Sequence, residues 1–191
     1  MLLLPGAGSD RTQHTLVAID EALSPLPVVR ADFPYRKAGR RAPDRAPVLL
    51  AALLEEAAAI VANATIAADQ LVLGGRSMGG RMCSMVVAGD DGKGGATEPL
   101  AAAGLVLVSY PLHPPGKPDR LRTAHLPALH VPCLFIHGTR DPFGTPDELM
   151  VATATIPGPV THVWIERGRH ELAGADPVIA QTVSDWVRAL R

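Results

Sequence analysis

Short apolar runs alternate with longer amphipathic runs along the chain, and glycines or prolines stand at most of the joints between them. The short runs predict six strands, over residues 2–4, 28–33, 71–73, 104–109, 133–137 and 162–166. All but the last are nearly continuous in apolar residues, which is typical of strands covered on both faces. The pattern therefore predicts a sheet that lies inside the molecule.

The longer runs predict helices with one apolar face, over residues 13–23, 48–67, 77–88, 146–155 and 177–190. Alternating strands and helices favour right-handed crossovers and parallel strands. We therefore predict an α/β fold, a three-layer αβα sandwich whose mostly parallel sheet has about six strands. Residues 89–99 and 111–118 are predicted loops, because glycine or proline is frequent in them.

Composition and charge fit one domain over residues 1–191, because 47% of the residues are hydrophobic and 19% are charged. Eighteen Lys and Arg residues nearly balance nineteen Asp and Glu residues, which gives a net charge of −1. This balance provides no field that would favour nucleic acid or an anionic membrane as a partner.

Cellular location is indicated by the cysteines and by the apolar segments. Cys83 and Cys133 lie in apolar surroundings, which favours buried free thiols and a reducing compartment. No apolar stretch approaches the roughly 18 residues that a membrane span needs. The opening residues MLLLPGAG are too short for a signal peptide and lack its basic start. We therefore expect a cytoplasmic protein.

Candidate chemistry begins at Gly75-Arg76-Ser77-Met78-Gly79, which fits the pattern G-x-S-x-G between a predicted strand and a predicted helix. In that pattern a sharp turn holds the serine hydroxyl clear of the backbone, and Gly75 and Gly79 must be small for steric reasons. The alternative is a glycine-rich turn with an incidental serine. The strand and helix around it favour Ser77 as a nucleophile.

A serine nucleophile needs a base to take its proton and an acid to orient that base. Asp141 follows the predicted strand at 133–137, and His170 follows the strand at 162–166. Both lie in glycine-containing loops, in the chain order Ser, Asp, His. Loops at the carboxyl ends of parallel strands share one edge of the sheet, so Ser77, Asp141 and His170 are predicted to form a catalytic triad.

Other histidines are weaker candidates for the base. His137 is the strongest rival, but it precedes the acid in the chain and is better interpreted as packing against or orienting the Asp141 loop. His125 and His130 are five residues apart, which is not the i, i+4 spacing of two ligands on one helical face, so we expect no metal site. Asp147 and Glu148 suit the first turn of a helix. Two further histidines are His162, inside a predicted strand, and His113, in the connection over 111–131.

Acyl transfer also needs two backbone N–H groups that stabilise a developing oxyanion. One is predicted at Met78, the residue after the serine, and the other in the glycine-rich turn of LLLPGAGSD after the first strand. Ala7 is the best candidate there, with Gly6 shaping the approach. The alternative is a plain strand–helix turn.

Six segments resemble small α/β-hydrolase-like proteins of the dienelactone-hydrolase clan: LLLPGAG, ADFPYRKAGRRAPDRAP, LVLGGRSMGGRM, VSYPLHPPGKPDRLRTAHL, IHGTRDPFG and RGRHEL. The resemblance spans nearly the whole chain and extends to bacterial predicted hydrolases, testis-expressed hydrolase-like proteins and the hydrolase-like domain of a histone-acetyltransferase complex subunit. It implies Ser77 as nucleophile, Asp141 as acid and His170 as base. Some eukaryotic members are thought to be scaffolds.

The sequence departs from that family in three places. Dienelactone hydrolases proper carry a cysteine nucleophile, so Ser77 favours a generic esterase. The oxyanion turn has Pro5-Gly6 where many relatives have His-Gly. The full fold begins with an extra pair of strands, whereas Met1 opens directly onto the first predicted strand, and this difference is left open. The basic stretch over 36–45 is interpreted as a solvated loop, with an anion grip as the alternative.

These observations predict a serine hydrolase that needs no cofactor and cleaves a small ester, thioester or related acyl bond. The alternatives are a non-catalytic binding or scaffold domain and an acyltransferase with the same triad. The connection over 110–131 is too short for a cap domain, and its prolines favour a rigid loop with Leu112 and His113 as pocket walls. A shallow site of this kind favours short acyl groups.

Overall fold

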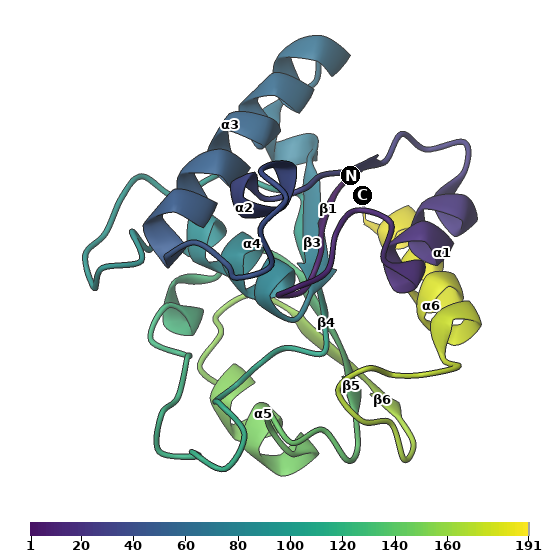
Figure 1. Ribbon diagram of the computed structural model, residues 1–191. Coiled ribbons are helices and arrows are strands. Elements are labelled where there is room, and N and C mark those ends of the chain that lie inside the picture. Colours follow the sequence, from purple (N-terminus) through teal and green to yellow (C-terminus); the bar gives the residue numbers. More distant parts are fainter. Residues whose placement is uncertain (191) are drawn as a thin grey trace.

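A computed structural model describes residues 1–190 and contains a six-stranded sheet in the order β2-β1-β3-β4-β5-β6 (Figure 1). All five neighbouring pairs are parallel. The strands are β1 (Leu2–Leu4), β2 (Val29–Arg30), β3 (Val72–Arg76), β4 (Gly104–Val108), β5 (Cys133–Gly138) and β6 (Val160–Ile165). The predicted α/β class with a parallel sheet is confirmed.

Helices cover both faces of this sheet, which gives the predicted three layers (Figure 1). They are α1 (His14–Leu23), α2 (Pro34–Lys37), α3 (Ala46–Ala64), α4 (Met78–Ala88), α5 (Pro146–Thr153) and α6 (Asp176–Ala189), with 3-10 turns at Ala68–Gln70 and Leu126–Ala128. Helices α1 and α6 pack on one face, and α3 and α4 pack on the other. Consecutive strand residues alternate between the two cores, as Leu3 and Leu4 do in β1.

Parallel pairing places the carboxyl ends of all the strands at one edge of the sheet. Strands β3, β5 and β6 end there, and the loops that follow them carry Ser77, Asp141 and His170. Between β4 and β5 the described chain forms only the 3-10 turn Leu126–Ala128, so no cap domain is inserted there. The edge of the sheet is therefore open to a small molecule.

Several elements are shorter than predicted, among them β2, α3 and α5, which ends at Thr153 and not at residue 155. Strand β2 covers two residues and not 28–33, because it lies at the sheet edge and pairs only with the three-residue β1. Helix α3 ends at Ala64 and not at residue 67, because Thr65 adopts a left-handed conformation with φ of 52°. Helix α5 begins where it was predicted to begin, since Thr145 and Glu148 cap each other's backbone N–H groups.

Helix α3 corrects the expectation that no apolar stretch approaches the length of a membrane span. Its 19 residues are long and apolar enough by length and composition alone. A mostly buried core helix of a soluble protein passes the same test; α3 packs against α4, and Leu49, Leu50 and Leu53 belong to the core, but only 22% of its apolar window is buried. Its far end extends past the sheet in Figure 1. This feature is weak evidence for a membrane span.

Candidate active site

Ser77 occupies a strained turn between β3 and α4. Its φ of 51° and ψ of −114° lie outside the regions that side-chain-bearing residues prefer, at a cost of about 1–3 kcal/mol. The Ser77 N–H donates to the Val108 carbonyl at 2.8 Å, and the Arg81 N–H donates to the Ser77 carbonyl at 3.0 Å. These bonds tie the turn to β4 and to the first turn of α4, so the strained conformation is held from both sides.

Three glycines make this turn sterically feasible. A Cβ at Gly75 or at Gly79 would overlap the Leu4 carbonyl oxygen, and a Cβ at Gly80 would lie 2.7 Å from the Gly75 carbonyl oxygen. The close approach of β1, β3 and α4 therefore excludes any side chain at these positions. The requirement at Gly75 and Gly79 was expected from the motif, whereas Gly80 lies outside it.

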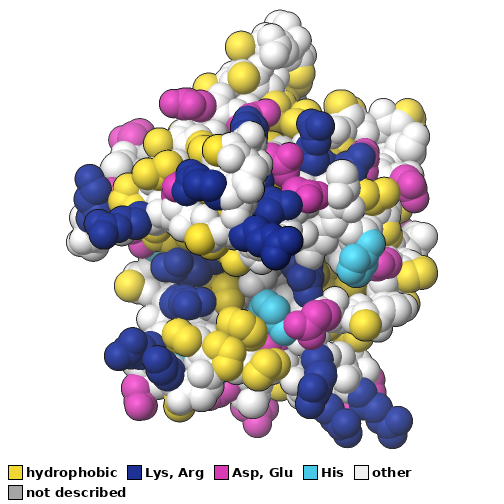
Figure 2. Space-filling view, viewed as in Figure 1, with side chains coloured by type: hydrophobic (Ala, Val, Ile, Leu, Met, Phe, Trp, Pro, Cys, Tyr) yellow, Lys and Arg dark blue, Asp and Glu magenta, His cyan; other side chains and the backbone are white. Residues whose placement is uncertain are grey.

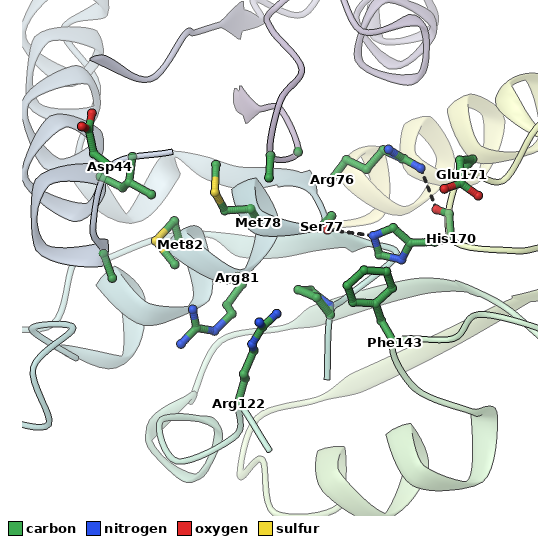
Figure 3. Close-up of a pocket in the computed structure, with 15 residues that line it drawn as sticks. Asp44, Arg76, Ser77, Met78, Arg81, Met82, Arg122, Phe143, His170 and Glu171 are labelled. Atoms are coloured by element: carbon green, nitrogen blue, oxygen red, sulfur yellow. Dashed lines mark hydrogen bonds between the residues drawn. The ribbon is translucent and has the colours of Figure 1, made fainter. Parts of the chain in front are cut away.

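Ser77, Asp141 and His170 lie together at the edge of the sheet. Figure 3 shows the contact between Ser77 and His170. The Ser77 Oγ is 2.8 Å from His170 Nε2, and His170 Nδ1 is 2.8 Å from Asp141 Oδ2. Asp141 is 3% exposed and His170 is 8% exposed. The other Asp141 oxygen, Oδ1, accepts the Phe143 N–H at 2.8 Å. A nearly buried carboxylate therefore orients an imidazole whose far nitrogen faces a serine hydroxyl.

Three further residues fix the His170 position. The Ser109 hydroxyl and Arg76 Nη2 both donate to the His170 carbonyl oxygen, at 2.8 Å and 2.6 Å. The Phe143 ring stacks on the imidazole with centroids 4.0 Å apart. Sequence reasoning missed all three. Ser109 could have been suspected from its place at the end of a predicted strand, but the contacts of Arg76 and Phe143 depend on tertiary structure.

His137, the rival base, lies beneath the Asp141 loop and not beside the serine. Its Nε2–H donates to the Gly144 carbonyl at 2.8 Å, and the same nitrogen is 3.6 Å from Asp141 Oδ2. Burial lowers the pKa of His137. This geometry fits the interpretation that His137 orients the loop.

The oxyanion candidates Ala7 and Met78 both line the cavity beside Ser77. Their neighbours in the loop after β1 are occupied, since the Gly6 N–H donates to Gln13 Oε1 and the Gly8 N–H donates to the Tyr35 hydroxyl, both at 3.3 Å. Within residues 1–190 no acceptor takes the Ala7 N–H, and the Met78 N–H lies in the first turn of α4, where no helical acceptor is available.

The cavity beside Ser77 has a volume of about 490 Å³. Its lining includes Asp44, Leu49, Arg76, Arg81, Met82, Pro111, Arg122, Phe143 and Glu171, in addition to the residues above. Lys and Arg side chains stand on several sides of the central hollow in Figure 2. Polar and charged groups thus form much of its wall.

Leu112 and His113 are not among these lining residues, so the prediction that they form pocket walls was wrong. Backbone hydrogen bonds from Arg122 to Leu112 and from His113 to Phe143 turn this part of the loop inward. Leu112 is fully buried and borders a separate apolar groove with α5. His113 is 5% exposed, and its Nε2 lies 3.6 Å from Glu148. Pro111 and Arg122 take their place in the wall.

The basic stretch over 36–45 is largely paired with carboxylates. Arg36 pairs with Asp10 at 3.0 Å, and Arg40 pairs with Asp44 at 2.8 Å. Lys37 contacts Glu56 at 3.4 Å. These pairs favour the interpretation of a solvated loop over an anion grip.

Cys83 and Cys133 are free and buried, as predicted. Burial raises the pKa of both thiols, that of Cys133 to about 12, so neither is a reactive thiolate. Among residues 1–190 no group of three His, Cys, Asp or Glu side chains is arranged to hold a metal ion.

Comparisons with known proteins agree with this fold. A family model described as an alpha/beta hydrolase domain matches residues 1–183. A serine hydrolase homologue from Coxiella burnetii has a TM-score of 0.73 and 16% identity, over 96% of this chain and 83% of that chain. A dienelactone hydrolase from Anabaena variabilis has a TM-score of 0.74 and 21% identity, over 100% and 87%. The type II thioesterase BorB from the borrelidin biosynthetic cluster has a TM-score of 0.69 and 18% identity, over 98% and 91%.

Proposed function

The chain belongs to the alpha/beta hydrolase domain family, as its sequence resemblance predicted, and from this premise we propose that it is a serine hydrolase cleaving a small carboxylic ester, thioester or related acyl bond. The observation that carries the proposal is the unbroken chain of 2.8 Å contacts from the Ser77 hydroxyl through His170 to the nearly buried Asp141. Ser77 and His170 line a cavity of small-molecule size. No cofactor takes part in this chemistry.

In the first half of the reaction, Ser77 attacks the substrate carbonyl while His170 Nε2 takes the hydroxyl proton. The carbonyl oxygen becomes an oxyanion, and the free N–H groups of Ala7 and Met78 donate to it. When the intermediate collapses, the bond to the leaving group breaks, and His170 gives its proton to the departing alcohol or thiol. Ser77 is left as an acyl ester.

In the second half, water takes the place of the leaving group. His170 removes a proton from that water as it attacks the acyl carbon, and then returns the proton to the Ser77 oxygen when the acyl ester breaks. The products are a carboxylic acid and the free enzyme. Asp141 stays ionised throughout and stabilises the imidazolium that forms in each half.

Labelling with a fluorophosphonate probe tests the proposal directly. Such a probe reacts with an activated serine, so the adduct should be found by mass spectrometry on the peptide that contains Ser77. A panel of esters and thioesters then distinguishes hydrolysis from acyl transfer, because transfer would need an added acceptor for turnover. Absence of labelling together with absence of turnover would instead favour the non-catalytic binding domain.

Short acyl chains should be the preferred substrates. The cavity holds about 490 Å³ with a partly charged wall, and no cap covers it, so methylenes beyond a short chain stay in water. Each methylene that stays in water adds little to the binding free energy, whereas burial of a CH₂ contributes roughly 0.8 kcal/mol. In a series of p-nitrophenyl esters, we expect kcat/KM to peak at about two to four acyl carbons. A steady rise to twelve or more carbons would contradict this.

We also infer a cytoplasmic location. Both cysteines are free, and a reducing compartment preserves free thiols.

A further inference from the structure

Two arginine side chains stand in the cavity wall without an acidic partner. Arg81 comes from the first turn of α4, and Arg122 comes from the connection between β4 and β5. Figure 3 shows the Arg122 guanidinium extending toward that of Arg81, beside Met78 and Met82. Within residues 1–190 neither guanidinium forms an ion pair, and the buried Nε of Arg81 has no hydrogen-bond partner.

Two other charged residues of the cavity wall, Asp44 and Arg76, already have contacts. Asp44 is paired with Arg40 at 2.8 Å. Arg76 donates to the His170 carbonyl, and although burial lowers the pKa of Arg76, the charge of Glu171 offsets part of that effect. Arg76 also has a buried Nε without a partner, but its Nη2 is held by the His170 carbonyl, whereas within residues 1–190 the guanidinium groups of Arg81 and Arg122 make no side-chain hydrogen bond or ion pair.

The two arginines also act on each other and on their surroundings. Burial lowers the pKa of Arg122, and the charge of Arg81 lowers it further. Burial, with a smaller contribution from Arg81, lowers the pKa of His125 to about 4. Two like charges that share a partly buried wall repel each other, and an anion placed between them would relieve that repulsion.

We propose that Arg81 and Arg122 bind a carboxylate carried by the substrate, so that the preferred substrate is a short ester or thioester with a free carboxylate near the scissile bond. Guanidinium groups bind carboxylates through paired hydrogen bonds. Arg81 lies at the end of the first turn of α4, where its backbone N–H donates to the Ser77 carbonyl at 3.0 Å. The proposal rests on the hydrolase function proposed above.

Three arginines and two acidic side chains line the cavity, and Asp44 is already paired with Arg40, so the wall carries an excess of positive charge. An anionic group on the substrate complements that excess, and a planar carboxylate matches the paired N–H groups of a guanidinium. Ser77, Arg81 and Arg122 line the same cavity, so a short acyl chain on Ser77 shares that space with both guanidinium groups.

Two methyl esters of the same shape test the proposal. Monomethyl succinate carries a carboxylate where methyl 4-methylpentanoate carries an isopropyl group, so the ratio of their kcat/KM values, measured by pH-stat, isolates the charge. We expect the wild-type ratio to favour the succinate ester at least about tenfold at low ionic strength, and to fall by about 10–100-fold in Arg81→Gln and in Arg122→Gln. The matched control is Arg120→Gln, an exposed arginine of the same loop, which should leave the ratio unchanged.

A binding measurement separates this inference from the hydrolase proposal. Calorimetry with Ser77→Ala should detect monomethyl succinate, and the further changes Arg81→Gln and Arg122→Gln should abolish that binding. Binding without turnover of either ester by the wild-type protein would support the carboxylate site and overturn the hydrolase. Turnover with a ratio near one would overturn the carboxylate site alone, and so would methyl phosphate binding more tightly than monomethyl succinate. Absence of both binding and turnover would overturn both.

Discussion

Replacing Ser77 with alanine should lower kcat/KM for ester hydrolysis at least about a thousandfold, because triad members act as a unit and the alanine side chain cannot form the acyl ester. The same change should abolish fluorophosphonate labelling. The fold should survive, since the substituted alanine keeps the backbone bonds to Val108 and Arg81 and adds no atom to the crowded turn. Steady-state rates with a short p-nitrophenyl ester and a thermal melt measure the two effects separately.

Ser84 provides the matched control, because it lies on α4, the helix that follows Ser77, but is not among the residues that line the cavity. Its hydroxyl donates to the Arg81 carbonyl at 2.8 Å and is 2.7 Å from His125 Nε2. Ser84→Ala should therefore keep both labelling and turnover. Labelling that persisted in Ser77→Ala and disappeared in Ser84→Ala would show that the nucleophile had been assigned to the wrong serine.

The sequence was sufficient to predict the sheet and the three candidate triad positions, because both follow from local patterns. Nearly continuous apolar runs mark strands that are buried on both faces, and parallel pairing then brings their following loops to one edge. Ser77, Asp141 and His170 each stand shortly after a predicted strand, so their proximity did not depend on the details of side-chain packing. Their catalytic roles stay predictions.

The wall of the cavity could not be predicted in the same way. The direction of the loop after β4 is set by backbone bonds from Arg122 to Leu112 and from His113 to Phe143, which join distant parts of the chain. Those bonds bury Leu112 and bring Arg122 to the cavity. The need for glycine at position 80 has a similar origin, because it arises where α4 meets the backbone of β3. Local residue patterns do not predict contacts of this kind.

The burial of helix α3 was also not predicted fully by the sequence. Its apolar residues predicted a helix with one buried face, and Leu49, Leu50, Leu53 and Ala57 are buried as such a face requires. The exposed positions of the same helix are also rich in apolar residues, Val48 and Leu54 among them. Composition alone therefore did not distinguish a helix that packs on one side from a helix that is apolar all round.

Asp141→Asn should lower kcat/KM by about a thousandfold to ten-thousandfold while leaving the fold intact, because the asparagine would hold His170 in the wrong tautomer. The Phe143 N–H donates to Oδ1 of residue 141, so in the variant the amide oxygen is retained at that position. The amide NH₂ then faces His170 Nδ1 and donates to it, which moves the imidazole proton to Nε2. A protonated Nε2 cannot accept the Ser77 proton, so the nucleophile is not activated.

The control for that variant is Asp147→Asn, which removes an exposed carboxylate from the first turn of α5, six residues further along the chain. It should leave kcat/KM within about threefold of the wild-type value, because an exposed charge at this distance is screened by water and salt. Both variants are measured with the same short ester, and the rate of fluorophosphonate labelling gives a second readout of Ser77 reactivity. A rate near wild type in Asp141→Asn would show that His170 needs no acid for its orientation, and it would remove Asp141 from the proposed triad. The asparagine can keep both contacts of Asp141 only with its oxygen toward the Phe143 N–H and its NH₂ toward His170 Nδ1.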